Sequence, residues 1–174
     1  MRIAALPCIL LLAAFATARA EPPSPSARAE MAKLAPLAGK WRGGAWMDMP
    51  DGSRGTSRSE ETVEVRLDGR ALLIEGVHHD EETGALVHHA NALLAWDDRR
   101  QEYRMASVLA SGVTGTYSAR LEGERLVWML AGPAGPRRRF TIRVEGDRWL
   151  ETGEISFDGE TWKPFFEMAL TRVK

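Results

Sequence analysis

All four histidines of the 174-residue chain fall into two pairs, His78-His79 and His88-His89, separated by an acidic segment that includes residues 80–84. If the chain turns about Thr83-Gly84, the two flanks pair as a hairpin in which His78 opposes His89. Opposed side chains on one face of a sheet lie about 4.5–5.5 Å apart at Cβ, which would let two imidazoles share a metal ion. One histidine pair would face the inside of the fold and the other would face solvent.

Three interpretations of these histidines remain open. A zinc site would need a third ligand from residues 80–82 or from Asn91, and no recognised zinc spacing is present. His78 and His89 could instead contact the polar group of a bound ligand, and binding would then depend on pH because imidazole titrates near neutrality. The third interpretation is a set of polar residues that lines a hairpin at the rim of the fold.

Two further charged residues are candidates for a site. Alternation places Arg138 on the inner face if Phe140 points inward, where its guanidinium could bind a carboxylate group. The alternative for the triplet 137–139 is a solvated charge run. Glu151 is predicted to point inward among apolar residues such as Ile142. A buried carboxylate requires a partner or a raised pKa, so Glu151 is either a functional group or the sign of a wrong register.

The elements that must position these residues are strands. Asp-Gly, Gly-Glu and Gly-Asp pairs begin at residues 68, 123, 146 and 158, and each separates two strand-like runs as a tight hairpin turn does. The predicted strands are 39–48, 57–67, 70–79, 87–96, 101–109, 113–122, 125–131, 138–145, 148–157 and 160–172. An open sheet of ten strands with one apolar face would leave costly edges. We therefore expect an all-β, antiparallel up-and-down meander closed into a barrel, since a two-sheet sandwich needs longer crossovers.

Period-two alternation predicts which side chains share the inner face of this barrel. Across their turns, Val65 should oppose Leu72, and Ile155 should oppose Trp162. The predicted lumen wall consists of Val63, Val65, Leu72, Ile74, Leu93, Ile142, Trp149, Trp162 and Phe166. The predicted polar anchors near the mouth are His78, His89, Asn91 and Arg138.

Loop lengths distinguish the two ends of the barrel. The long connections, at 49–56, 80–86, 110–112 and 132–137, follow alternate strands and should gather at one end, the mouth. Asp158-Gly159 is the exception, a tight turn predicted at the mouth. The other end, the floor, has tight turns. Residues 29–37 are predicted to form one or two helical turns that Pro36 interrupts, and the segment 29–38 should cover the floor.

The first twenty residues have the pattern of a secretory signal peptide: a basic start, an apolar stretch over 3–15 and a predicted cleavage site before Glu21. The stretch is too short to span a bilayer. Its loss would remove Cys8 and leave 21 of the 23 basic residues against 24 acidic ones, a net charge of −3 that does not suggest a nucleic-acid partner. We expect an exported, periplasmic or secreted protein without stable membrane insertion. A Pro/Ser-rich linker and the start of a short helix should occupy 21–33, and the barrel domain 34–174.

A short helix followed by Gly39-x-Trp41 and a meander resembles the lipocalin and fatty-acid-binding (calycin) superfamily. Residues 39–43, Gly-Lys-Trp-Arg-Gly, are also similar to the opening of the nitrobindin haem barrels. Secreted bacterial lipocalin-like proteins without an assigned function share Leu67-Asp68-Gly69-Arg70, Trp96-Asp97, Ser156-Phe157-Asp158-Gly159 with Trp162, and a last strand ending in Arg172. The resemblance covers roughly residues 34–174 and implies a barrel with an internal cavity, but it brings no catalytic residue. Nitrobindin-like haem binding would need an axial histidine near the C-terminal strands, and residues 165–170 contain none.

The sequence thus predicts an exported barrel that binds a small hydrophobic or amphipathic molecule in its lumen. The alternatives are a metal- or haem-dependent enzyme built on the histidine hairpin (His78, His79, His88 and His89) and a structural or interaction barrel with a filled core. No nucleotide-binding motif, nucleophile–base pair or His-Glu-x-x-His occurs, which disfavours an enzyme. No cofactor is predicted, with haem and zinc as the alternatives to that expectation.

Overall fold

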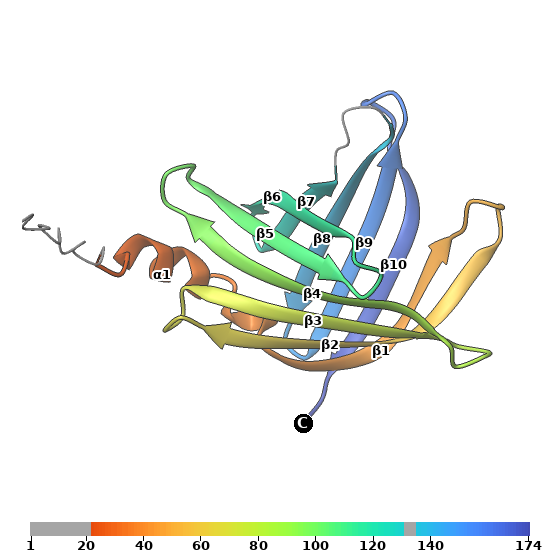
Figure 1. Cartoon of the computed structure of the whole chain (residues 1–174), viewed down its shortest axis with the longest axis horizontal. Helices are drawn as coiled ribbons and strands as arrows, with labels where there is room; N and C mark the ends of the chain where they lie inside the picture. The colour runs from red at the N-terminus through yellow and green to blue at the C-terminus, as the bar shows by residue number, and fades with distance from the viewer. Residues whose placement is uncertain (1–21, 131–134) are drawn as a thin grey trace, which may run out of the picture.

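The computed structural model describes residues 22–130 and 135–174. Ten antiparallel strands pair in chain order, and the first pairs with the last, so the sheet is a closed barrel (Figure 1). The strands are β1 (Gly39–Asp48), β2 (Arg54–Arg66), β3 (Ala71–Asp80), β4 (Leu86–Asp97), β5 (Glu102–Leu109), β6 (Thr114–Glu122), β7 (Arg125–Leu130), β8 (Arg137–Glu145), β9 (Arg148–Ser156) and β10 (Lys163–Arg172). The predicted fold class is confirmed. The predicted signal peptide lies outside the described residues.

The N-terminal helix begins earlier than the sequence predicts. Helix α1 spans Pro25–Ala32, and a short 3₁₀ helix, η1, spans Ala35–Leu37. The Ser24 side chain accepts a hydrogen bond from the Ala27 backbone N–H, and Pro25 occupies the first turn, where its missing N–H costs nothing. The Pro/Ser-rich segment is therefore partly a helix start rather than only a linker. Within the described residues, no helix has the length and apolar character needed to cross a bilayer.

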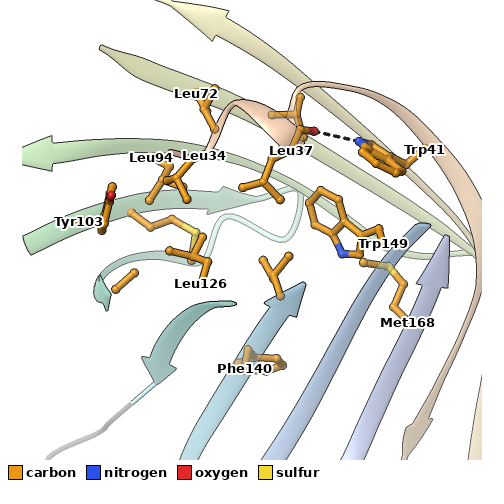
Figure 2. Close-up of a cluster of buried hydrophobic side chains, with 14 of the residues drawn as sticks. Leu34, Leu37, Trp41, Leu72, Leu94, Tyr103, Leu126, Phe140, Trp149 and Met168 are labelled. Atoms are coloured by element: carbon orange, nitrogen blue, oxygen red, sulfur yellow. Dashed lines mark hydrogen bonds between the residues drawn. The ribbon is translucent and has the colours of Figure 1, made fainter. Parts of the chain in front are cut away.

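The floor of the barrel is covered by this N-terminal segment, as predicted. Leu34 and Leu37 are buried in the core together with Trp41, which is fully buried (Figure 2). The Trp41 indole N–H donates to the Leu37 carbonyl at 2.9 Å, and the Tyr103 hydroxyl donates to the Glu30 carbonyl at 3.1 Å. The core thus occupies the floor half of the barrel, where α1 and η1 cover it.

Arg172, at the end of the last strand, joins the two ends of the chain. Its guanidinium lies 4.0 Å from the centre of the Trp41 ring and donates hydrogen bonds to the carbonyls of Ala38 and Pro36. Both carbonyls lie at the end of η1, where backbone oxygens lack partners within the helix and a charged donor is a strong partner. Arg172 therefore stabilises the closure between β1 and β10.

The long connections lie at the end opposite α1, as predicted. Figure 1 shows the β1–β2, β3–β4 and β9–β10 connections projecting away from the helix, while the β2–β3 and β4–β5 turns lie beside it. The β7–β8 connection belongs to the same end but falls partly on residues 131–134, outside the described residues. The register predicted across the β2–β3 and β8–β9 turns is also confirmed, with Val65 opposite Leu72 and Ile142 opposite Glu151.

Candidate functional site

The inner face of β2 changes from apolar to polar side chains directly after the core residue Val63, in the direction of the mouth. Alternation from Val63, which is 3% exposed, carries the inner face to Glu61 and Ser59, which are 7% and 1% exposed. Glu61 lies opposite Gly76 on β3, where a Cβ atom would stand 2.6 Å from a Glu61 carboxylate oxygen. The absence of a side chain at Gly76 therefore makes the room that the carboxyl group occupies.

His78 connects this row into a hydrogen-bonded chain. Its Nε2 lies 3.2 Å from Glu61 Oε1, and its Nδ1 lies 3.3 Å from the Ser59 hydroxyl, which in turn lies 3.2 Å from the Ser57 hydroxyl. Burial lowers the pKa of His78, so the imidazole is neutral at pH 7. Neutral imidazole has one donor and one acceptor nitrogen, which matches the two partners on either side.

A second carboxyl group, Glu151 on β9, enters the same interior from the other side of the barrel. Glu151 is 8% exposed and lies opposite Ile142 on β8 and Met168 on β10. Burial, and then repulsion from Glu61, raises the pKa of Glu151 to about 8. Burial alone raises the pKa of Glu61 to about 8. The two acids are thus close enough to disfavour each other's charge, and the inward placement predicted for Glu151 is confirmed.

Indole groups surround Glu151. The N–H groups of Trp128 and Trp149 favour its ionised form and so oppose the rise in its pKa. Trp149 is 2% exposed and stands edge-on to Trp41 at 5.5 Å, yet its N–H lacks a well-formed hydrogen bond with any described residue. Figure 2 shows this nitrogen on the side of the ring toward Met168, the residue opposite Glu151. We call Glu61, Glu151, His78, Ser59 and Trp149 the inner polar cluster.

The predicted pairing of His78 with His89 is wrong by one residue. His78 lies opposite His88, and their rings meet edge-to-face at 5.0 Å, whereas His89 lies opposite Val77 on the outer face and bonds Glu75 at 3.0 Å. The reason is the β3–β4 connection, which is not a two-residue turn. The Asp80 carboxylate accepts hydrogen bonds from the N–H and hydroxyl of Thr83, and this longer loop with a bulge after His78 shifts the register.

The same shift moves two other predicted inner residues outside. Because His88 and Leu94 point inward, Asn91 and Leu93 point outward, and Leu93 is 44% exposed while Leu94 is fully buried. Val65 shares the inner face with Val63 but lies beyond the packed layer at the floor rim, 51% exposed. The lumen wall therefore contains Val63, Leu72, Ile74, Ile142, Trp149 and Phe166 from the predicted set.

The predicted inward placement of Trp162 is also wrong. Trp162 precedes β10, and the guanidinium of outward-facing Arg139 covers its ring at 4.3 Å. The Asp158 carboxylate accepts the backbone N–H groups of Glu160 and Thr161, so this connection is a wider loop and not the expected tight turn. A bulge between Pro164 and Phe166 then returns Phe166 to the inner face, where it is 8% exposed.

Two inner-face residues near the mouth are less buried than the core residues at the floor. His88 is an inner-face residue on β4, yet its side chain is exposed; neighbouring groups still lower its pKa, first by desolvation and then through His78. Arg138 continues the inner face beyond Phe140 and is half-buried. His88 and Arg138 thus lie on the mouth side of the inner polar cluster.

The pairing of His78 with His89 that the sequence suggested for a shared metal ion does not occur. His78 and His89 are on opposite faces of the wall, so they cannot share one ion. Across residues 22–130 and 135–174, no group of three His, Cys, Asp or Glu side chains is placed to hold a metal.

A separate cleft of about 500 Å³ lies at the floor, between the N-terminal segment and the β6–β7 and β8–β9 turns. It is lined by Lys33, Leu34, Leu37, Leu121, Leu126 and Val144, among others. Leu126 and Ile142 also line the cleft and belong to the hydrophobic core, so the cleft reaches the core from the floor side.

Sequence reasoning missed Glu61 and Ser59, although the signal was present. The alternation that places Val63 inward places Glu61 and Ser59 inward as well, and Gly76 falls directly opposite Glu61 in the predicted β2–β3 hairpin. A buried acid facing a glycine is therefore readable from the register alone. The unpartnered Trp149 indole had no such signal, because it depends on side-chain geometry.

The fold and this interior define an all-β, ten-stranded closed barrel with a polar cluster set into an apolar core. Among solved structures, the chain is similar to Rv2717c from M. tuberculosis, with a TM-score of 0.62 and 17% sequence identity over 87% of this chain and 99% of that protein. At this identity the similarity shows the fold alone. Comparison with protein-family models gives no match, and comparison with curated proteins gives none either.

Proposed function

We propose that this barrel binds a small amphipathic molecule, which enters by the mouth and places its polar end on the inner polar cluster. The observation that carries the proposal is the burial of two carboxyl groups, Glu61 and Glu151, inside an apolar barrel. Burying such groups costs several kcal/mol unless they are well paired, and an apolar core of the same volume would be at least as stable. A ligand that pairs with them explains why the interior carries this cost.

The wall above the cluster suits the apolar body of such a molecule. Trp128 and Phe140 stack at 4.2 Å between ring centres, Tyr117 follows at 5.5 Å from Trp128, and Phe166 at 5.9 Å from Phe140. These rings come from four neighbouring or nearby strands on the inner face. Binding sites for small molecules are typically apolar and aromatic with a few placed polar groups, and this interior has that composition.

The proposed location follows from the N-terminal sequence. A signal peptide over residues 1–20 would deliver the barrel to the periplasm or the exterior, where a carrier for an amphipathic molecule is useful because such molecules are poorly soluble in water. Nucleic acid is not part of the proposal.

Two matched variants test it. Ala90 is an inner-face residue on β4 opposite Gly76 and Leu109, and Ala106 is an exposed outer-face residue on β5. Ala90→Trp should obstruct the lumen, whereas Ala106→Trp adds the same side chain to the outside. Uptake of the neutral apolar probe N-phenyl-1-naphthylamine, followed by its fluorescence, should be lost in the first variant and kept in the second. Equal uptake by both variants, or none by the unaltered protein, would refute binding in the lumen.

A further inference from the structure

The inner polar cluster contains acids but lacks a positive charge. Among the described residues, the ion pair of Glu61 is with His78, which burial keeps neutral at pH 7. Glu151 takes part in none of the ion pairs formed between described residues. Glu61 lies opposite Trp41 on β1, and the Trp41 ring meets the ring of Trp149, two residues from Glu151 on β9, at 5.5 Å. Repulsion from Glu61 also contributes to the raised pKa of Glu151. Ionisation of either acid would therefore leave a buried negative charge with no cation beside it.

The inward-facing groups on the strands around the cluster do not supply this positive charge. On β4 the inward His88 has a lowered pKa, and on β6 the inward group is the neutral hydroxyl of Tyr117. On β8, Arg138 lies opposite Ile155, four residues along β9 from Glu151, which is roughly 13 Å toward the mouth. On β10, the Arg172 guanidinium is engaged by backbone carbonyls and by Asp147 below the Trp41 ring. The described strands therefore present no cation at the level of the two acids.

The surroundings of Glu151 are nevertheless built for a carboxylate. The indole N–H groups of Trp128 and Trp149 both favour its ionised form. The Trp149 N–H lacks a well-formed partner while the residue is 2% exposed. A buried donor left in this state gains a hydrogen bond when a nearby carboxylate becomes charged and shifts slightly toward it. The Trp149 N–H is therefore placed to donate a hydrogen bond once Glu151 is ionised.

We propose that the bound molecule carries a basic nitrogen, which sits as an ammonium group between Glu61 and Glu151 with its apolar chain along the aromatic wall. This inference rests on the proposed function and names the chemical class of the ligand. An ammonium group has three N–H donors and no acceptor, so it can bond both carboxyl groups at once. A carboxylate ligand would instead meet two acids, and its favourable position would be near Arg138 at the mouth.

Binding of an ammonium ion should release a proton. Near pH 7 the buried acids are mainly protonated, since the pKa of each lies at about 8. An incoming cation stabilises the carboxylate, so the O–H proton leaves to solvent while no covalent bond of the ligand changes. Affinity should therefore rise with pH from about 6 to 8 and level off until the amine itself loses its proton near pH 10.

The test compares n-octylammonium, n-octanol and octanoate by isothermal titration calorimetry at pH 7, in two buffers of different protonation enthalpy. We expect octylammonium to bind at least about tenfold more tightly than octanol and to release up to about one proton. Octanoate should bind more weakly than octylammonium. If octanol or octanoate binds as tightly as the amine, the charge assignment is overturned while lumen binding stands. If none of the three binds, both proposals fail.

Three isosteric variants assign the effect to the cluster. Glu151→Gln and Glu61→Gln should each reduce octylammonium affinity about tenfold or more and leave octanol within about twofold. Glu64→Gln is the matched control, because Glu64 lies on the outer face of β2 beside Arg66. An unchanged amine affinity in both inner variants would overturn the inference, as would an equal loss in the Glu64 variant.

Discussion

At the scale of single residues, the interior depends on a glycine that faces an acid. A Cβ at Gly76 would stand 2.6 Å from one Glu61 oxygen and 3.0 Å from the other, so Glu61 could not keep its place beside His78. Gly44, on the outer face of β1, differs because a Cβ there would meet only the Ser57 carbonyl at 3.6 Å, an ordinary contact. The burial of the Glu61 carboxyl group therefore depends on the absence of a side chain at Gly76.

This dependence predicts that Gly76→Ala lowers the free energy of unfolding by about 1–3 kcal/mol, because an overpacked interior must move a buried carboxyl group. Gly44→Ala should change it by less than about 1 kcal/mol. Urea unfolding followed by tryptophan fluorescence measures both. Equal stability of the two variants would mean that Glu61 has room to relocate, contrary to its buried position.

The two buried acids also predict how stability depends on pH. Their pKa values are about 8 in the folded protein and near the ordinary 4.5 in the unfolded chain, so the folded state holds more protons between these values. The stabilisation is fully present below about pH 4.5 and is lost as pH rises through 8. We expect the unfolding free energy to fall by a few kcal/mol between pH 5 and pH 9.

The double variant Glu61→Gln/Glu151→Gln isolates this contribution, because neither amide titrates. Its unfolding free energy, from urea melts at pH 5, 7 and 9, should fall less with pH than that of the unaltered protein. Glu64→Gln should retain the original slope. The same slope in the double variant and the unaltered protein would show that the acids are not buried as described.

At the scale of elements, the sequence predicts strands well and wide loops poorly. The residue types of Asp68-Gly69 and Gly146-Asp147 favour tight hairpin turns of defined geometry. The predicted registers of the β2–β3 and β8–β9 hairpins are therefore confirmed. The connections around Asp80 and Asp158 are shaped by side-chain hydrogen bonds to nearby backbone, which alternation cannot count. A one-residue error there exchanges faces, which is why His89 and Trp162 were expected inside.

The closure of β1 on β10 yields a prediction for Arg172. Arg172→Gln should lower the unfolding free energy by about 1–3 kcal/mol, since it removes the cation over Trp41 and weakens the bonds to Ala38 and Pro36. Arg143→Gln, at an exposed ion pair on β8, should cost less than about 1 kcal/mol. Thermal unfolding of both variants measures the two effects. A similar loss of stability in both would contradict a stabilising role of Arg172 in the closure between β1 and β10.

At the scale of the whole molecule, the barrel has a floor covered by α1 and η1 and a polar cluster within its apolar interior. The floor was predictable because Gly39-x-Trp41, short turns and the N-terminal segment all point to one end. The inner polar cluster was predictable only in part. Glu151 and His78 follow from alternation, whereas the presence of Glu61 and Glu151 in one interior depends on the closure of the sheet between β1 and β10. In the proposed function the interior is the binding site, and the covered floor supports it.

The most direct measurement is a crystal structure of the full barrel grown with n-octylammonium. We predict that the ammonium nitrogen lies within hydrogen-bond distance of Glu61 and Glu151, with the alkyl chain along Trp128 and Phe140 toward the mouth. An interior filled by its own side chains with no amine in it, or an amine seated only outside the barrel, would contradict it.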